Sequence, residues 1–561
     1  MLWFLVFVVA VFGILSTTNV LNYVLIILQP LDDPNVCPVF EPLAPDNFYI
    51  DNSTVVKILE DPVYRLWSVG NLAGAVQVDT QVVDHLPDVD EAPKLWRNFG
   101  DFHSYLEKAF PKVHEVLEIF KVNTYGLVFY WKGLDEKLKP LMLTAHQDVV
   151  PVQKETLSDW TYPPFEGHYD GKYVYGRGAS DCKNSLIAAL EAVELLIGEG
   201  YTPTRGVVMA FGFDEEISGV YGAQTLSKFL EEKFGKNGIY ALIDEGPGLL
   251  MDPITKQLVA CPSTGEKGYA DIRVDLNMPG GHSSVPPDHS AVGIMGELAY
   301  NIEQDPFQPQ LIEGNPILGY LQCLALNSGE RLSKLQRKAI LRAGFDKLAN
   351  LKVVEMLAKS RLTKYLIQTS QAVDLINGGE KANALPENVY LVVNHRITVG
   401  QTVDFVKSHF ASRVRAIGEK YDLEVSAFGK TVYTPEKSKG VIKTELFSEP
   451  VLEYAPVSPA DDNVWEYLAR TTRHVFENLV LKNSTDYPII TAPSIMPANT
   501  DTKYYWNLTK NIYRYLPMIV NLLESNIHSV DEKIEFDGHL QLTAFYYEYI
   551  QNVDTAAADN K

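Results

Sequence analysis

Three short apolar segments in the first half of the chain each end in charged or metal-binding residues, and this repetition constrains the fold most strongly. The segments 141–145, 207–213 and 240–243 lead into His146-Gln147-Asp148, Asp214-Glu215-Glu216 and Asp244-Glu245-Gly246. A short apolar run without alternation is typical of a strand that is buried on both faces of a sheet. Acidic groups at the end of such a strand are costly unless a positive charge compensates them. In an open α/β sheet the carboxyl ends of the strands form one edge, so the pattern predicts a metal site there.

A glycine-rich turn supplies a fourth polar group. Residues 176–181 read Gly-Arg-Gly-Ala-Ser-Asp and precede a strongly periodic apolar pattern at 186–197, which predicts a helix. Taken alone, Asp181 is equally well explained as the N-cap of that helix. Its position among the three strand ends makes it a candidate metal ligand as well.

The candidate ligands carry too much negative charge for a single zinc ion. They are His146, Asp181, Glu216 and Asp244. A catalytic zinc ion has three protein ligands and keeps one position open, so three carboxylates exceed what one site needs. Two divalent ions that share a bridging carboxylate would balance this charge and hold both oxygens of a hydrolytic intermediate. A second histidine is then needed, and His528 is the candidate.

In this order the motifs resemble the dinuclear-zinc aminoacylase/carboxypeptidase family, metallopeptidase family twenty. The resemblance covers roughly residues 50–555, and segments 144–152, 176–186 and 211–219 are most similar to its fungal vacuolar Gly-Xaa carboxypeptidases. It implies an α/β fold with a zinc-exopeptidase-like catalytic domain, in which helices flank a mixed sheet, and an inserted α+β lid domain. The catalytic domain is expected to comprise two segments, 51–263 and 434–555, with the lid at 264–433 between them and a tail at 556–561.

The resemblance further implies two Zn²⁺ ions per chain and a role for each motif residue. Asp181 would bridge the two ions, and each ion would have one further pair of ligands: His146 with Asp244, and Glu216 with His528. Glu245 is adjacent to Asp244 and is the alternative ligand. In related enzymes the bond after the bridging aspartate is a cis peptide, which here is Asp181–Cys182.

Two motif residues would act without holding a metal ion. The resemblance implies that Glu215 is the general base, which takes a proton from the attacking water and passes it to the leaving amine. Asp148 would orient His146 through the ring nitrogen that faces away from the metal.

Three residues of the lid would contact the substrate. In related proteins the histidine equivalent to His282 polarises the scissile carbonyl, often in a partner subunit's active site. Asn383 would help to hold the substrate, and Arg396 would pair with its carboxylate in a bidentate manner. On local pattern alone, His282 fits an exposed turn and Arg396 a solvated strand end. Ala498 and Lys503 stand where the family usually has glycine and arginine, which leaves the substrate preference open.

The first 29 residues form a separate apolar element. As one helix, 1–29 would span a bilayer, whereas as two elements its first half would be the core of a cleaved signal peptide. We favour an uncleaved signal-anchor followed by a stalk at 30–50. This predicts a single-pass protein of a vacuolar or lysosome-like membrane with its catalytic domain in the lumen, secretion being the alternative. Glycosylation sequons at Asn52, Asn483 and Asn507 fit this secretory route.

The net charge and the cysteine content limit which ligands and which disulfides this chain can have. The formal net charge of −22 over 561 residues argues against nucleic acid as a ligand. The four cysteines have no metal-type spacing and allow one disulfide, whose partners the sequence does not choose. The Leu-rich, helical segment 311–370 is interpreted as an insertion into the lid. It has no assigned function, and it could obstruct the homodimer that many relatives form through the lid.

These observations predict a zinc carboxypeptidase that releases the C-terminal residue of small Gly-Xaa or N-blocked peptides. An amidohydrolase acting on N-acyl amino acids, including fatty-acyl ones, is the alternative within the same chemistry. A catalytically silent receptor or scaffold would be expected to lose ligands, whereas here all the expected ligands and Glu215 are present.

Overall fold

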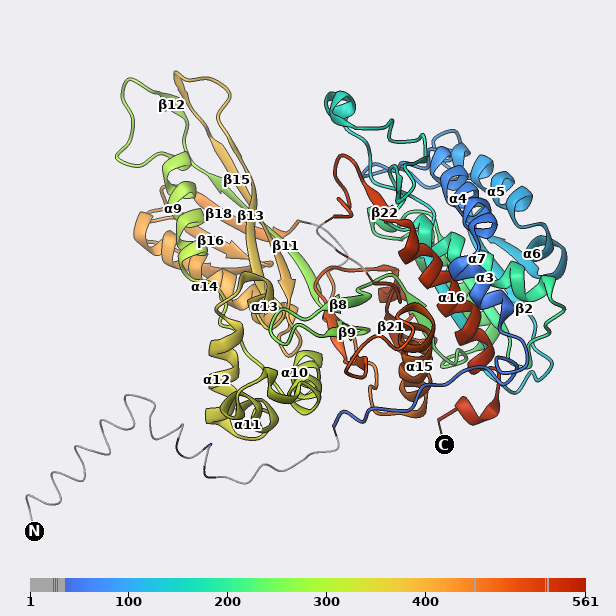
Figure 1. Ribbon diagram of the computed structural model, residues 1–561. Helices are drawn as coiled ribbons and strands as arrows, with labels where there is room; N and C mark the ends of the chain where they lie inside the picture. Colours follow the sequence, from blue (N-terminus) through green and yellow to red (C-terminus); the bar gives the residue numbers. More distant parts are fainter. Residues whose placement is uncertain are drawn as a thin grey trace, which may run out of the picture.

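In the computed structural model the chain forms a catalytic domain from which a second sheet, the lid, projects (Figure 1). The structure describes residues 36–447, 451–519, 521 and 524–560, together with Val24, Ile26 and Leu28. The predicted signal-anchor therefore lies almost entirely outside the described residues. Within them, no helix combines the length and apolar character needed to cross a membrane.

The catalytic domain is built on an eight-stranded mixed sheet. Its strands, in spatial order, are β1 (Glu118–Val122), β2 (Gly126–Trp131), β6 (Val207–Gly212), β3 (Leu141–His146), β7 (Leu242–Asp244), β21 (Ile512–Arg514), β10 (Ser263–Glu266) and β20 (Ser494–Met496). The three predicted buried strands are β3, β6 and β7, and they run parallel to one another at the centre. Every residue of β3 and β6 is buried, which explains why neither strand shows alternation in the sequence.

Helices cover both faces of this sheet. One face packs against α3 (Ser53–Glu60), α4 (Pro62–Gln77), α5 (Arg97–Ala109), α6 (Pro111–Val116), α7 (Lys183–Gly198), α15 (Asn463–Arg473) and α16 (Phe536–Asn552). The other face packs against α8 (Ala223–Phe234). Successive side chains of β3 point to opposite faces of the sheet: Met142 packs on the side of α8, and Leu143 packs on the side of α7. Two small sheets complete the domain: β4 (His168–Tyr169) with β5 (Tyr173–Tyr175) and β22 (Lys533–Glu535), and β8 (Leu249–Met251) with β9 (Leu258–Ala260) and β19 (Ile490–Thr491).

The lid is a six-stranded sheet with helices on one face. Its strands, in spatial order, are β13 (Ser370–Gly378), β15 (Asn388–Ile397), β11 (Gly268–Asn277), β18 (Val441–Leu446), β16 (Glu424–Ala427) and β17 (Lys430–Tyr433), and its helices are α9 (Ala291–Gln304) and α14 (Val403–Tyr421). Buried and partly exposed residues alternate along β11, as its sequence predicts for a strand with one wet face. An antiparallel pair of two short strands, β12 (Gly281–His282) and β14 (Ala384–Leu385), forms the far tip of the lid in Figure 1.

The lid extends further along the chain than the expected boundary at residue 433. Strand β18 lies between β11 and β16 and is hydrogen-bonded to both, so it belongs to the lid sheet. The position between β11 and β16 is filled by a strand that comes only after the β16–β17 hairpin in the chain. The return to the catalytic domain therefore follows residue 446.

The helical insertion packs against the catalytic domain. It comprises α10 (Pro316–Asn327), α11 (Lys334–Arg342), α12 (Lys347–Leu357) and α13 (Arg361–Lys364). Its apolar residues share one core cluster with Val259, Cys261, Ile490 and Ile495, which come from the catalytic domain. The insertion thus belongs to the lid in sequence and forms a layer of the catalytic domain in space (Figure 1).

A disulfide joins Cys37 to Cys323, and the other two cysteines are free and buried. Cys323 lies in α10, so the bond ties the stalk to the helical insertion across 286 residues of sequence. Closing a loop of that length removes much conformational entropy from the unfolded chain, on the order of 5 kcal/mol at 25 °C.

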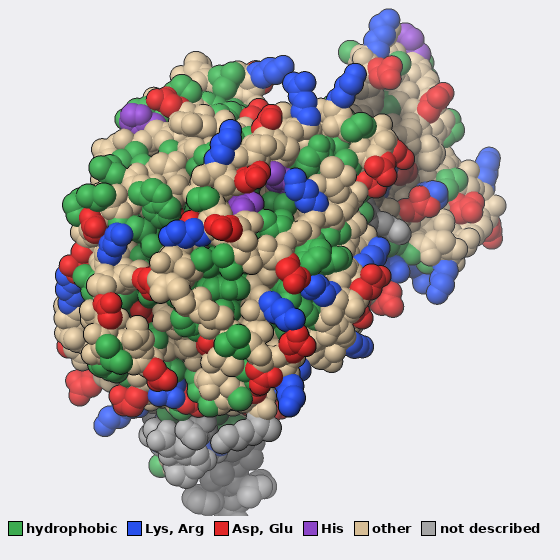
Figure 2. All heavy atoms as spheres, turned by 90° about the vertical axis from the view of Figure 1, so that its right-hand side faces the viewer, with side chains coloured by type: hydrophobic (Ala, Val, Ile, Leu, Met, Phe, Trp, Pro, Cys, Tyr) green, Lys and Arg blue, Asp and Glu red, His purple; other side chains and the backbone are tan. Residues whose placement is uncertain are grey.

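The molecular surface carries both signs of charge. On the face shown in Figure 2, acidic and basic side chains are interspersed among polar and apolar ones. All three sequon asparagines, Asn52, Asn483 and Asn507, are exposed and therefore accessible to a glycosyltransferase.

One buried histidine makes the lid sensitive to acid. His395 of β15 is fully buried, and its Nδ1 lies 3.3 Å from the carbonyl oxygen of Ala270. Burial lowers its pKa to about 4, whereas an unfolded histidine has a pKa of about 6.5. Between these values the unfolded chain binds the extra proton, so the free energy of unfolding falls as the pH falls, by about 3 kcal/mol when pH 4 is reached.

Urea unfolding of wild type and His395→Gln at pH 7 and pH 5 tests this prediction. The substitution should reduce the difference in the free energy of unfolding between the two pH values, and an unchanged difference would contradict the prediction.

Candidate metal centre

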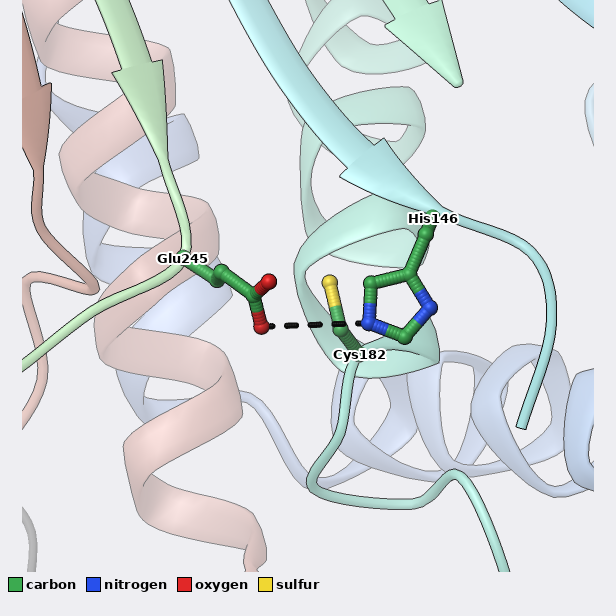
Figure 3. A group of neighbouring side chains, drawn as sticks. All are labelled: His146, Cys182 and Glu245. Carbon is green, nitrogen blue, oxygen red and sulfur yellow. Dashed lines mark ion pairs between the residues drawn. The ribbon is translucent and has the colours of Figure 1, made fainter. Parts of the chain in front are cut away.

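The carboxyl ends of the central strands converge with the turn before α7, as the sequence predicts. His146 is the last residue of β3, Glu245 follows β7, and Cys182 immediately precedes α7. Figure 3 shows these three side chains pointing toward one another. Ligand atoms of His146, Cys182 and Glu245 lie within 4.8 Å of one another, and so do those of a second group, His146, Asp181 and Glu216.

Asp181 lies between the two histidines with one carboxylate oxygen directed at each. Its Oδ1 is 3.0 Å from Nε2 of His146, and its Oδ2 is 3.0 Å from Nε2 of His528. The same nitrogen of His528 is 3.3 Å from Oε2 of Glu216. Ligand atoms around a tetrahedral zinc ion with bonds of 2.0–2.1 Å are separated by about 3.3 Å, so both halves of the cluster fit this coordination. The Asp181–Cys182 peptide is cis, as the resemblance implies.

The structure brings Glu245, and not the predicted Asp244, to His146. Oε2 of Glu245 lies 3.8 Å from Nε2 of His146. Asp244 is the last residue of β7; its carboxylate is buried, and its Oδ2 has no hydrogen-bond partner among the described residues. Consecutive side chains at the end of a strand point in opposite directions, so only one of the two can face the histidine. This geometry favours Glu245, the alternative that the sequence leaves open, over Asp244 as the partner of His146.

Three acids of the cluster, Glu215, Glu216 and Glu245, are held in surroundings that disfavour their negative charge, whereas Asp181 is not. Burial, reinforced by Glu245, raises the pKa of Glu215 well above its ordinary value. Burial and the neighbouring Asp181 raise the pKa of Glu245 to about 7. Burial alone would raise the pKa of Asp181 too, but hydrogen bonds from both histidines hold it below its usual range. The hydrogen bond to Asp181, followed by that to Glu216, raises the pKa of His528 to about 10. A cluster that draws protons in this way has the charge that divalent cations would neutralise.

Asp148 organises both the first histidine and the acidic loop. Nδ1 of His146 lies 2.9 Å from the backbone oxygen of Asp148 and 3.4 Å from its Oδ1. The two carboxylate oxygens also accept hydrogen bonds from the backbone N–H groups of Glu215 (3.1 Å) and Glu216 (3.0 Å). One residue therefore positions the ring of His146, chiefly through its backbone oxygen, and the candidate base, through its carboxylate.

The buried carboxylate of Glu532, to which the sequence analysis assigns no role, holds the backbone around Asp181 in place. Oε1 of Glu532 accepts hydrogen bonds from the backbone N–H groups of Gly178, Ser180 and Asp181 at 3.0–3.2 Å, and its Oε2 accepts one from Arg177 at 2.6 Å. Its proximity to His528 in the chain is the signal that could have identified it, because the same loop then delivers a ligand and the support for Asp181.

The three predicted substrate residues occupy two different places. His282 and Asn383 lie together at the β12–β14 strand pair at the tip of the lid, where the N–H of Ser283 donates to the backbone oxygen of Asn383. Figure 1 places this strand pair at the end of the lid that is remote from the catalytic sheet. Arg396 lies at the base of the lid; it donates to Oδ1 of Asn499 (2.7 Å) and stacks over the ring of Tyr269. Arg396 therefore reaches the segment between Ala498 and Lys503, where the sequence departs from the family pattern, within one chain.

Separate substitutions of Asp244 and Glu245 distinguish the roles of these two adjacent residues. Glu245→Gln should lower the zinc content from two ions per chain toward one, because the ion beside His146 loses a charged ligand. Asp244→Asn should retain both ions, since its carboxylate does not face that histidine. Inductively coupled plasma analysis of both variants after gel filtration measures this. Loss of metal from Asp244→Asn alone would make Asp244 the ligand instead.

Comparison with known proteins agrees with this fold. The model of Peptidase family M20/M25/M40 matches residues 142–552, which hold every candidate metal ligand. The chain belongs to this family of peptidases.

Individual relatives extend the match over nearly the whole chain. Carboxypeptidase S of Saccharomyces cerevisiae is 45% identical over 531 residues, which cover 94% of this chain and 90% of that protein. The mouse N-fatty-acyl-amino acid synthase/hydrolase PM20D1 is 32% identical over 496 residues, covering 86% and 87%. Among solved structures, human carnosine dipeptidase 1 superposes with a TM-score of 0.60 over 91% of this chain and 100% of that chain; at 15% identity it supports the fold alone.

Proposed function

We propose that this protein is a dinuclear zinc carboxypeptidase that hydrolyses the C-terminal peptide bond of small Gly-Xaa or N-blocked peptides. The observation that carries the proposal is the position of Asp181, whose two oxygens face two histidines at 3.0 Å each. The 45% identity to Carboxypeptidase S supports the same reaction. His146 and Glu245 would hold one zinc ion, Glu216 and His528 the second, and Asp181 both.

The residues around this cluster divide the work of hydrolysis. Zinc, when bound, would supply the Lewis acidity that polarises the scissile carbonyl and makes water more acidic. Glu215, held by the Asp148 carboxylate, would take a proton from the attacking water and then transfer it to the leaving amine. Arg396, which now donates to Asn499, would pair with the carboxylate of the departing residue.

A second substrate class has support of its own. Hydrolysis of an N-acyl amino acid breaks the same amide bond and leaves the same carboxylate for Arg396. The 32% identity to PM20D1, named as a synthase and hydrolase of N-fatty-acyl-amino acids, favours this reaction as the alternative.

The cellular location of the enzyme and its homodimeric state are also proposals. A Cys37–Cys323 disulfide and three exposed sequons support passage through the secretory pathway to a vacuolar or lysosome-like lumen, with the apolar 1–29 segment as a membrane anchor. The remote position of His282 supports a homodimer in which each lid tip serves the partner subunit's site.

The test is amino-acid release by protein lacking residues 1–35, which keeps Cys37, with zinc present. Blocked Gly-Leu and N-oleoyl-phenylalanine are the two substrates, and Glu215→Gln is the blank. Leucine release that is absent from the blank supports the carboxypeptidase. Cleavage of the oleoyl amide alone assigns the protein to the acyl-amino-acid hydrolases, and no release of either product from zinc-loaded protein contradicts both.

A further inference from the structure

A single large cavity begins at the metal centre and continues into the helical insertion. Its volume is about 680 Å³, which is within the range of sites that enclose most of a drug-sized ligand. Asp181, Glu245 and His528 line one end. The cavity is therefore continuous with the place where the scissile amide would bind.

The far walls of the cavity are apolar, and helices α10, α12 and α13 supply much of them. Ile317 and Leu321 come from α10, Leu357 from the end of α12, and Leu362 from α13. The opposite wall comes from the catalytic domain, with Ile495 and Met496 among its residues. The insertion is the segment that the sequence left without a function, and it encloses one side of this space.

Asp252, a carboxylate that lines the cavity beside α10, already has hydrogen-bond partners. Oδ1 of Asp252 accepts from the backbone N–H groups of Ile254 and Thr255, and its Oδ2 accepts from the hydroxyl of Tyr320 at 2.8 Å. Asp252 is 2% exposed, so a substrate ammonium group would find neither a free acceptor nor water beside it. This region of the cavity suits an uncharged group.

The charge of the substrate decides which of its two halves enters. The departing amino acid keeps its carboxylate, and Arg396, the candidate partner for that group, does not line the cavity. The acyl half of an N-blocked substrate has no obligatory charge. It can therefore fill an apolar cavity without leaving an unpaired ion inside the protein.

We propose that helices α10–α13 are the specificity element of this enzyme, and that with the catalytic domain they form a pocket for a long hydrophobic acyl group on the amino side of the scissile bond. The inference rests on the proposed hydrolase function and favours its second substrate class, the N-acyl amino acids, because it names the residues that would select a long acyl group. It follows that a small blocked dipeptide leaves most of the pocket unfilled. Each added methylene of the acyl chain should raise kcat/KM about fourfold until the pocket is full.

The test compares N-acetyl-, N-octanoyl- and N-dodecanoyl-leucine as substrates. Wild type should cleave the dodecanoyl compound at least 100-fold more efficiently than the acetyl compound. Leu321→Trp should lower kcat/KM for the dodecanoyl compound at least tenfold and leave the acetyl compound within twofold, because the indole occupies the pocket and not the metal centre. Leu351→Trp is the matched control: it adds the same side chain to α12 of the same insertion, at a residue that is 55% exposed.

Two further measurements keep the outcome decisive. Leu362 lines the mouth and is 84% exposed, so Leu362→Glu should fold even if Leu321→Trp does not, and its charge should weaken the long substrate selectively. Calorimetric titration of N-dodecanoyl-leucine into Glu215→Gln reports binding without turnover. A kcat/KM that does not vary with chain length, or a Leu321→Trp defect equal for all three substrates, overturns the pocket. Tight, Leu362-dependent binding without hydrolysis by wild type would instead overturn the proposed function and keep the pocket.

Discussion

Glu215→Gln is expected to lower kcat by about 10²- to 10⁴-fold while the protein keeps its full complement of zinc. The amide is nearly the same size as the carboxylate, and the backbone N–H at this position can still donate to Asp148, so the loop should keep its place. What would be lost is the proposed general base. Steady-state kinetics with metal analysis of the same preparation measures both quantities.

The neighbouring acid is the control for that result. Glu216→Gln makes the same chemical change one residue later, at a carboxylate that lies 3.3 Å from Nε2 of His528. It should lose zinc from the second position, so added zinc should restore some of its activity, whereas Glu215→Gln should not respond to zinc. If Glu215→Gln lost metal as readily as Glu216→Gln, Glu215 would be a ligand and not the base.

Asp181→Ala is expected to remove both zinc ions and all measurable activity. Its carboxylate is the one that faces both histidines, so both positions lose a charged ligand at once. Without that anion the remaining histidines and acids are an incomplete set for either ion. Metal analysis and a thermal melt with and without zinc would test this, because zinc should no longer raise the melting temperature.

Glu532→Gln should weaken zinc binding less than Asp181→Ala does. The Glu532 side chain accepts from three backbone N–H groups around Asp181, so the amide should disturb the position of the bridge without removing it. Zinc affinity should fall by about 10- to 100-fold, the usual cost of losing an outer hydrogen-bond partner.

The outcome that would contradict the Asp181 prediction is also defined. If Asp181→Ala still held one zinc ion at full occupancy, the bridging role of Asp181 would be excluded.

The strands and their polar ends could be predicted because burial on both faces leaves an unmistakable apolar run. The choice between Asp244 and Glu245 could not, since both follow the same strand and the sequence does not record which one turns toward His146. The packing of α10–α13 was also beyond prediction: their apolar stripes indicate burial but do not identify the surface that buries them. Strand β18 shows the same limit, because its place in the lid depends on partners far away in the chain.

Combined with the proposed membrane anchor at 1–29, the Cys37–Cys323 bond has a consequence for release of the protein by proteolysis. A protease that cuts upstream of Cys37 would free the body of the enzyme in one step. A cut between Cys37 and α3 would break the backbone, yet the upstream piece would stay attached through α10 until the disulfide was reduced. Shedding by that second route would require two signals together, one proteolytic and one reductive.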